Sequence, residues 1–209
     1  MQAGDRDVEG IVMNKNRLEA FSDGVFAIVI TLLVLEIRVP EVDYEHLSKA
    51  LIDLLPQVFA YVISFGVIGV YWVAHHQSIR LVTKVNSYLI WLNHAYLFVV
   101  SCMTFSTALL GRYTMQPLPI VIYGINLIIA NIIGVMLARF LRSHPDFGRP
   151  YAHQQLHKSR LLSIFINSSY GLAILLGFVA PIVSYIIFVT MLLVAITFYS
   201  LNPLNLSDE

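Results

Sequence analysis

Long apolar runs separated by short polar segments divide this chain into six hydrophobic stretches. Each stretch holds roughly 20 residues, the length that an α-helix needs to cross a hydrocarbon core about 30 Å thick. Pro40 ends the first stretch, and Pro181 separates the last two, which would otherwise form one run of about 40 residues, too long for a single crossing. The predicted helices cover Phe21–Val39, Leu54–His75, Leu89–Leu110, Leu118–Phe140, Leu161–Ala180 and Ile182–Leu201.

Composition assigns these helices to a membrane. Hydrophobic residues make up 57% of the 209 residues and charged residues only 12%, and the mean hydropathy is +0.73. A soluble domain carries roughly 25% charged residues. We therefore predict an all-α membrane protein with a polar N-terminus (residues 1–16), one six-helix transmembrane channel domain (17–201) and a short tail (202–209).

Basic residues near the helix ends predict the orientation, because cytoplasmic loops carry an excess of Lys and Arg. If both termini are cytoplasmic, ten basic residues face the cytoplasm and only Arg38, Lys49 and Arg112 face outside. The ten are Arg6, Lys15, Arg17, Arg80, Lys84, Arg139, Arg142, Arg149, Lys158 and Arg160. We expect this orientation.

Several classes of function are disfavoured. The 13 basic residues balance the 13 acidic ones and form no basic tract, so we expect no nucleic-acid partner. The single cysteine, Cys102, excludes an intrachain disulfide. Signatures of zinc proteases, serine hydrolases and phosphate-binding loops are absent, so we expect no enzyme, no resident metal and no cofactor. The potassium-filter sequence T-V-G-Y-G is absent as well.

The first predicted helix, RLEAFSDGVFAIVITLLVLEI, has two different faces. At about 100° per residue, Ile28, Leu32 and Leu35 share one apolar stripe, with Thr31 beside it. Asp23 precedes Ile28 by five residues and so points roughly 140° away from that stripe. The apolar stripe and the charged position therefore belong to separate surfaces.

An ionisable residue inside a membrane helix costs about 2.5–3.5 kcal/mol and needs a partner. We predict an interhelical polar network in which Asp23 accepts hydrogen bonds from Trp72 and from a histidine. Its candidate members are Arg17, Trp72, His75, His76, Arg80, Asn93 and His94. The network has three alternative roles: fixing helix packing, contacting a permeating ion, or relaying protons between Asp23 and a histidine.

The same stretch resembles the first helix of the transmembrane protein 175 family, the endosomal and lysosomal potassium channels and their bacterial relatives. The R-x-x-x-F-S-D motif of that family corresponds to Arg17, Phe21, Ser22 and Asp23. Two further stretches are similar to the family: YWVAHHQ at the end of the second predicted helix, and WLNHAYLFVVSCMTFSTALLGRY in the third. The last three helices match by hydropathy only.

The resemblance implies a single-repeat bacterial member that forms a homotetramer in the plasma membrane of a prokaryote. Four first helices would line a central pore, with Ile28, Leu32 and Leu35 at the constriction and Thr31 at a position that favours potassium over sodium. The F-S-D residues would bond to the second and third helices behind the pore.

These expectations predict a leak-type channel with potassium as the permeating ion and modest selectivity over sodium. Apolar rings close a pore by dewetting and offer no carbonyl cage to replace the hydration shell. The alternatives are a proton-coupled secondary transporter or proton-conducting channel that uses Asp23 and a histidine, and a membrane subunit with a purely structural role. Transporters often contain inverted repeats, and the sequence shows no second copy of the F-S-D stretch.

Overall fold

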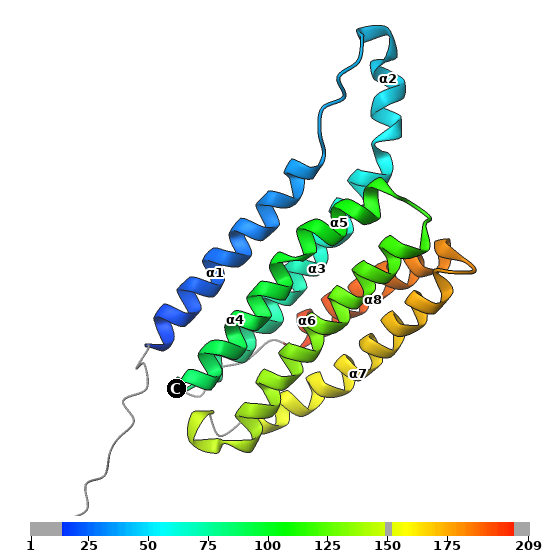
Figure 1. Cartoon of the computed structure of the whole chain (residues 1–209). Coiled ribbons are helices and arrows are strands. Elements are labelled where there is room, and N and C mark those ends of the chain that lie inside the picture. Colours follow the sequence, from blue (N-terminus) through cyan, green and yellow to red (C-terminus); the bar gives the residue numbers. More distant parts are fainter. Residues whose placement is uncertain (1–13, 149–151, 203–209) are drawn as a thin grey trace, which may run out of the picture.

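The computed structural model describes residues 14–148 and 152–202, which form an antiparallel bundle of long helices (Figure 1). These residues contain no β-strand, and an isolated bridge joins Val82 to Gly148 between two loops at one end of the bundle. The helices are α1 (Lys15–Leu32), η1 (Leu33–Glu36), α2 (Tyr44–Asp53), α3 (Leu55–Arg80), α4 (Ser87–Ser101), α5 (Met103–Arg112), α6 (Pro117–Ser143), η2 (Pro145–Phe147), α7 (Ala152–Leu176) and α8 (Pro181–Leu201).

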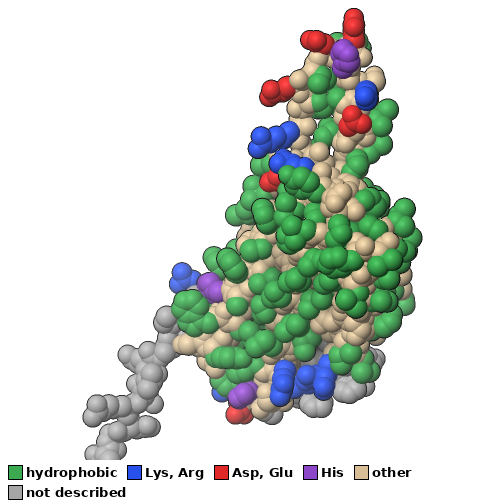
Figure 2. Space-filling view, turned by 45° about the vertical axis from the view of Figure 1, so that its right-hand side comes forward, with side chains coloured by type: hydrophobic (Ala, Val, Ile, Leu, Met, Phe, Trp, Pro, Cys, Tyr) green, Lys and Arg blue, Asp and Glu red, His purple; other side chains and the backbone are tan. Residues whose placement is uncertain are grey.

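Five helical segments among the described residues are long and apolar enough to cross a membrane. They are α1 with η1, α3, α4 with α5, α6 and α8. In α7 the described apolar part, Arg160–Leu176, is shorter, so a sixth crossing stays a prediction. Figure 2 shows hydrophobic side chains over the middle of the molecule and charged side chains towards its two ends. The chain is an all-helical, multi-pass membrane protein.

Several helix ends differ from those predicted. The first α-helix ends at Leu32 and continues as a 3₁₀ turn to Glu36, α3 runs on past His75 to Arg80, and α7 begins at Ala152 instead of Leu161. Hydropathy marks the part of a helix that lies in hydrocarbon, whereas the backbone hydrogen bonds continue into polar flanking residues. The predicted helix therefore ended too early for α3 and began too late for α7, and the predicted end of α7 at Ala180 lies four residues past its observed end at Leu176.

The third predicted helix is interrupted. Cys102 lies between α4 and α5, which together form one segment long enough to cross the membrane. On either side of the break, Ser101 Oγ donates to Phe98 O (2.7 Å) and Thr104 Oγ1 donates to Ser101 O (3.0 Å). Hydroxyl groups that bond back to helix carbonyls are associated with helix bending.

The helices pack around an apolar core that also contains a small polar cluster. Tyr123 of α6 packs edge-on against Phe188 of α8, with ring centres 5.2 Å apart. Buried hydroxyls join three helices: Ser64 of α3 lies 3.0 Å from the Tyr123 hydroxyl and accepts a hydrogen bond of 2.8 Å from Thr107 of α5. Each of these polar groups has a partner, as burial away from water requires.

The first helix, α1, lies at the edge of the bundle. In Figure 1 it runs along one side, next to α4 and α3, while α6, α7 and α8 form the opposite side. The short helix α2 stands beyond the end of the bundle, and none of its residues is buried. One face of α1 therefore contacts its own chain, and the other face is left uncovered by it.

Candidate functional site

The buried face of α1 follows helical spacing. Leu18, Ser22, Phe26 and Val29 are buried and recur at intervals of three or four residues, which aligns them on one side of the helix. Leu33, in the 3₁₀ turn, continues this row and is also buried. This face packs against α3 and α4 and fixes the position of α1.

The opposite face is exposed in the chain. The exposed fractions are 59% for Ile28, 45% for Leu32 and 67% for Leu35, and Thr31 is exposed beside them. Leu35 stays in line with Leu32 although it lies in the 3₁₀ turn, because residues three apart eclipse one another in a 3₁₀-helix. We call Ile28, Thr31, Leu32 and Leu35 the exposed face of α1.

Thr31 adds the polar group of this face. Its hydroxyl donates to Ala27 O at 2.8 Å and lies 2.9 Å from Ile28 O. A hydroxyl that uses its single proton on the helix backbone still has an oxygen acceptor to offer. The exposed face therefore combines three aliphatic side chains with one hydroxyl oxygen.

Two contacts tie the side of α1 to α3. Trp72 Nε1 donates to Asp23 Oδ1 at 2.8 Å, and His76 Nδ1 lies 3.4 Å from Glu19 Oε1. The Trp72 and His76 rings are stacked, with centres 5.5 Å apart. Glu19 precedes Asp23 by four residues on α1, and His76 follows Trp72 by four residues on α3. This is the pairing expected of two antiparallel helices in contact.

A second, fully buried chain of hydrogen bonds joins α1, α4 and α3. Asn93 Nδ2 donates to Ser22 Oγ at 3.0 Å, and Ser22 Oγ donates to Leu18 O at 2.8 Å. Asn93 Oδ1 lies 2.6 Å from His75 Nε2. Because the Asn93 oxygen is an acceptor only, His75 must carry its proton on Nε2 and donate it.

Aromatic contacts hold the histidines of this region. The His75 ring stacks on Tyr96 with centres 5.2 Å apart and an interplanar angle of 9°, and it also contacts Phe26. Phe21, at the edge of α1, stacks on His94 of α4 at 5.2 Å. The orientation of α1 is thus fixed by rings as well as by hydrogen bonds.

The predicted network is divided into two groups. The hydrogen bond expected from Trp72 to Asp23 is present, but the expected histidine donor to Asp23 is wrong. His75 bonds to Asn93, and His76 lies 3.4 Å from Glu19. The His94 ring lies 2.8 Å from Ile90 O and stacks on Phe21. Neighbouring residues point about 100° apart on a helix, so His75 and His76 reach different partners. Arg17 is exposed, and its side chain makes no hydrogen bond or ion pair among the described residues.

Glu19 was not identified from the sequence. Its position four residues before Asp23 puts it on the same side of α1, and His76 follows Trp72 by the same step. That repeated spacing is the signal that would have paired the two residues. The spacing alone could not pair Glu19 with His76, because the sequence does not show how α1 and α3 are aligned with one another.

The exposed face of α1 is the side of this helix that its own chain leaves uncovered. Among the described residues there is no group of three or more His, Cys, Asp and Glu side chains that could hold a metal ion. A single exposed helix face encloses no path, whereas several copies around an axis would enclose one. The exposed face of α1 is therefore the candidate functional surface.

Comparisons with known proteins identify the family of this chain. The family described as endosomal/lysosomal potassium channel TMEM175 matches residues 17–103. That range contains all the residues of the exposed face of α1 and of both groups of contacts behind it. A solved structure of a lysosomal potassium-selective channel TMEM175 homologue from Chamaesiphon minutus is 30% identical, covers 88% of this chain and 95% of its own, and has a TM-score of 0.75.

Two curated relatives are similar over part of their length. A potassium channel of a Chryseobacterium strain is 43% identical over 120 residues, which are 57% of this chain and 61% of that protein. The human endosomal/lysosomal proton channel TMEM175 is 23% identical over 198 residues, which are 90% of this chain and 39% of that protein. The chain therefore spans less than two thirds of the length of either relative.

Proposed function

Because this chain belongs to the TMEM175 family, we propose that it forms a potassium-permeable cation channel whose pore is lined by the exposed face of α1. The family match begins near the start of α1 and includes the whole of α3 and α4. Its bacterial relative from Chryseobacterium is named a potassium channel. The function proposed for this chain is ion conduction, without catalysis and without a resident cofactor.

One observation carries the proposal: α1 is anchored on one side and uncovered on the other. Ser22 and Asp23 bond to Asn93 and Trp72 behind the helix. Ile28, in α1, and Leu35, in the 3₁₀ turn that follows it, keep more than half of their surface exposed. Because these contacts fix the orientation of α1, its exposed face can form a defined contact surface for another protein chain.

The partner in front of α1 is a further copy of the same chain. We propose a homotetramer in which four α1 helices surround a central axis, in the plasma membrane of a prokaryote and with both termini in the cytoplasm. Closed rotational symmetry brings identical surfaces of each copy to the axis. Monovalent cations then pass between the four exposed faces, and no nucleic acid is involved.

Ile28, Leu32 and Leu35 would each form one ring of four apolar side chains. Such rings exclude water and close a narrow pore, since methyl groups offer nothing to a dehydrated cation. Conduction requires the rings to widen until a hydrated or partly hydrated ion fits. The Thr31 oxygen lies between the levels of Ile28 and Leu32 and is the acceptor that favours potassium, so we expect a leak-type channel of modest selectivity.

A second candidate function is proton conduction, because the human relative is named a proton channel. The hydrogen bonds and ion pairs give little support to a proton relay between Asp23 and a histidine. Asp23 bonds to Trp72, and both His75 and His76 have other partners. Proton permeation would instead follow the same water-filled pore as potassium.

Reconstitution tests the proposal. The purified chain is fused into planar bilayers, and reversal potentials are measured with KCl on one side and NaCl on the other, and then across a pH gradient in symmetric KCl. A channel-type current that reverses towards the potassium equilibrium potential supports the proposal. In liposomes that contain the purified chain, saturable potassium uptake that requires a proton gradient indicates a carrier. The absence of any potassium flux indicates a structural subunit. Either result contradicts the proposal.

A further inference from the structure

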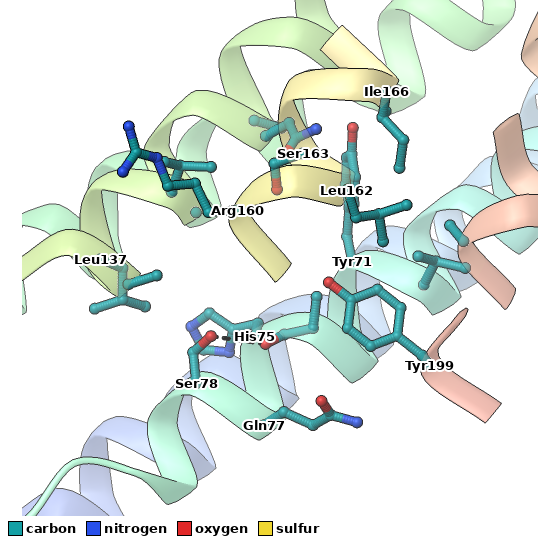
Figure 3. A pocket seen from close by; sticks show the side chains of 18 of the residues that line it. Tyr71, His75, Gln77, Ser78, Leu137, Arg160, Leu162, Ser163, Ile166 and Tyr199 are labelled. Carbon is teal, nitrogen blue, oxygen red and sulfur yellow. Dashed lines mark hydrogen bonds between the residues drawn. The ribbon is translucent and has the colours of Figure 1, made fainter. Parts of the chain in front are cut away.

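A cavity lies on the far side of α3 from α1, between α3, α6, α7 and α8 (Figure 3). Figure 3 shows side chains of α7, among them Leu162 and Ser163, facing Tyr71 and Ser78 of α3 across the open space, with Tyr199 of α8 at one side. The space open to the centres of water-sized molecules is about 80 Å³. One water needs only about 10–15 Å³ by that measure, so a larger occupant fits.

The cavity is elongated along the bundle. Its lining along α3 extends from Val67 to Leu81, the residue that follows the helix, and fourteen helical steps cover about 21 Å at 1.5 Å per residue. That length is more than half of a hydrocarbon core about 30 Å thick. Most of the lining side chains are apolar, including Val70, Leu137 and Ile166. The walls therefore suit a long, thin hydrocarbon group.

Arginine side chains occupy one end of this cavity. Arg142, in the last turn of α6, and Arg160, on α7, both belong to its lining, and Arg142 lies within electrostatic range of Arg139 and Arg160. None of the described residues that line the cavity is Asp or Glu. This end of the bundle is the one that the distribution of basic residues assigns to the cytoplasm.

We propose that the cavity binds an anionic phospholipid, with one acyl chain between α3, α6, α7 and α8 and the phosphate group at Arg142 and Arg160. Basic pockets between membrane helices on the cytoplasmic side attract anionic lipid headgroups, and guanidinium groups bind phosphate through paired hydrogen bonds. The acyl chain fills an apolar space that water would occupy at a cost. Arginine recognition and an apolar tunnel select for an amphiphile that carries both groups.

This lipid site is independent of ion conduction. The described residues that line the cavity come from α3 and the residue after it, and from α4, α6, α7 and α8, and include none from α1. Failure of the channel proposal would leave the lipid site in place, and loss of lipid binding would not remove the exposed face of α1. Both proposals require only that the chain lies in a membrane.

Native mass spectrometry of the intact protein, released from mild detergent, tests the lipid site. Phosphatidylglycerol and phosphatidylcholine with identical acyl chains are titrated separately, and the bound fraction is measured. We expect phosphatidylglycerol to bind at least tenfold more tightly than phosphatidylcholine. Arg142→Gln with Arg160→Gln should abolish this preference, and Ser163→Phe, which fills the cavity but keeps both arginines, should weaken binding of both lipids.

Arg80→Gln is the matched control, because Arg80 is a basic residue at the same end of the bundle that does not line the cavity. It should bind phosphatidylglycerol as the unaltered chain does. Size-exclusion elution identifies variants that have lost their fold. If the double variant is among them, the single variant Arg160→Gln replaces it, because the Arg160 side chain is exposed. Equal binding of phosphatidylglycerol and phosphatidylcholine overturns the proposal. An unchanged preference for phosphatidylglycerol in the arginine variants overturns it as well.

Discussion

The indole N–H of Trp72 donates to the Asp23 carboxylate across 2.8 Å and ties α3 to α1 directly behind the exposed face of α1. Trp72 is 39% exposed, so this contact lies at the edge of the chain and not in its core. A carboxylate within a membrane helix that accepts a hydrogen bond from another helix of its own chain is suited to holding the helix in place. Asp23 thus belongs to the support of α1.

Replacing Asp23 by alanine should weaken the protein more than it changes ion preference. A hydrogen bond to a charged group contributes about 1.5–3 kcal/mol when buried, and partial exposure reduces this to about 1–2 kcal/mol. Asp23→Asn keeps an acceptor for Trp72, so its free energy of unfolding should fall by less than half as much as that of Asp23→Ala. Thermal unfolding and size-exclusion chromatography in detergent measure the effect, with Glu41→Ala, at an exposed position in the loop between η1 and α2, as the control. Normal assembly combined with altered selectivity would assign Asp23 to the ion pathway.

Altering the apolar rings should change conduction. Ile28→Asn brings a polar group into the constriction, and Leu35→Ala widens it, so both variants should raise the leak current several-fold and relax the preference for potassium. Reversal potentials under KCl and NaCl gradients measure the change. Leu193→Ala is the matched control, since Leu193 is a 58% exposed leucine on α8. Unchanged currents in Ile28→Asn and Leu35→Ala would exclude this face as the pore lining.

The buried chain from Ser22 to His75 should act as one unit. Asn93→Ala leaves the His75 N–H without its acceptor, which costs about 1–3 kcal/mol. Ser22→Ala should cost less, because it leaves only the Asn93 Nδ2 group without its partner, whereas Asn93→Ala removes the contacts with both Ser22 and His75. In a double-mutant cycle we expect a coupling of about 0.5–1.5 kcal/mol between Ser22 and Asn93, measured by unfolding in detergent. Additive effects of the two substitutions would show that the 3.0 Å contact between them contributes nothing.

Close packing of α5 against α3 should make Gly111 sensitive to substitution. A Cβ atom on Gly111 of α5 would lie 2.8 Å from the backbone Cα of Gln57 on α3, and a backbone atom cannot move aside as a side chain can. Gly111→Ala should therefore destabilise the bundle by about 1–3 kcal/mol. Gly171→Ala is the control, because its added Cβ meets no atom within 4 Å apart from its chain neighbours and its own helix backbone, and alanine improves helix propensity there. Equal melting temperatures for the two variants would contradict the packing of α3 against α5.

The membrane helices and the two faces of α1 could be predicted from the sequence. Hydropathy identifies segments long enough for a bilayer, and the angle between Asp23 and Ile28 follows from the local geometry of an α-helix. Neither property depends on the rest of the chain. The exposure of Ile28, Leu32 and Leu35 agrees with that angle, although Leu35 lies in a 3₁₀ turn that the hydropathy pattern did not indicate.

Apart from the predicted hydrogen bond from Trp72 to Asp23, only the tertiary structure decided which residues meet across helices. The sequence made both His75 and His76 candidates for Asp23, and the structure pairs them instead with Asn93 and Glu19. Such pairs depend on the register and crossing of separate helices, which no local pattern contains. The same holds for the break at Cys102 and for the cavity beside Arg160. Local geometry thus determined the faces of each helix, and long-range packing determined their partners.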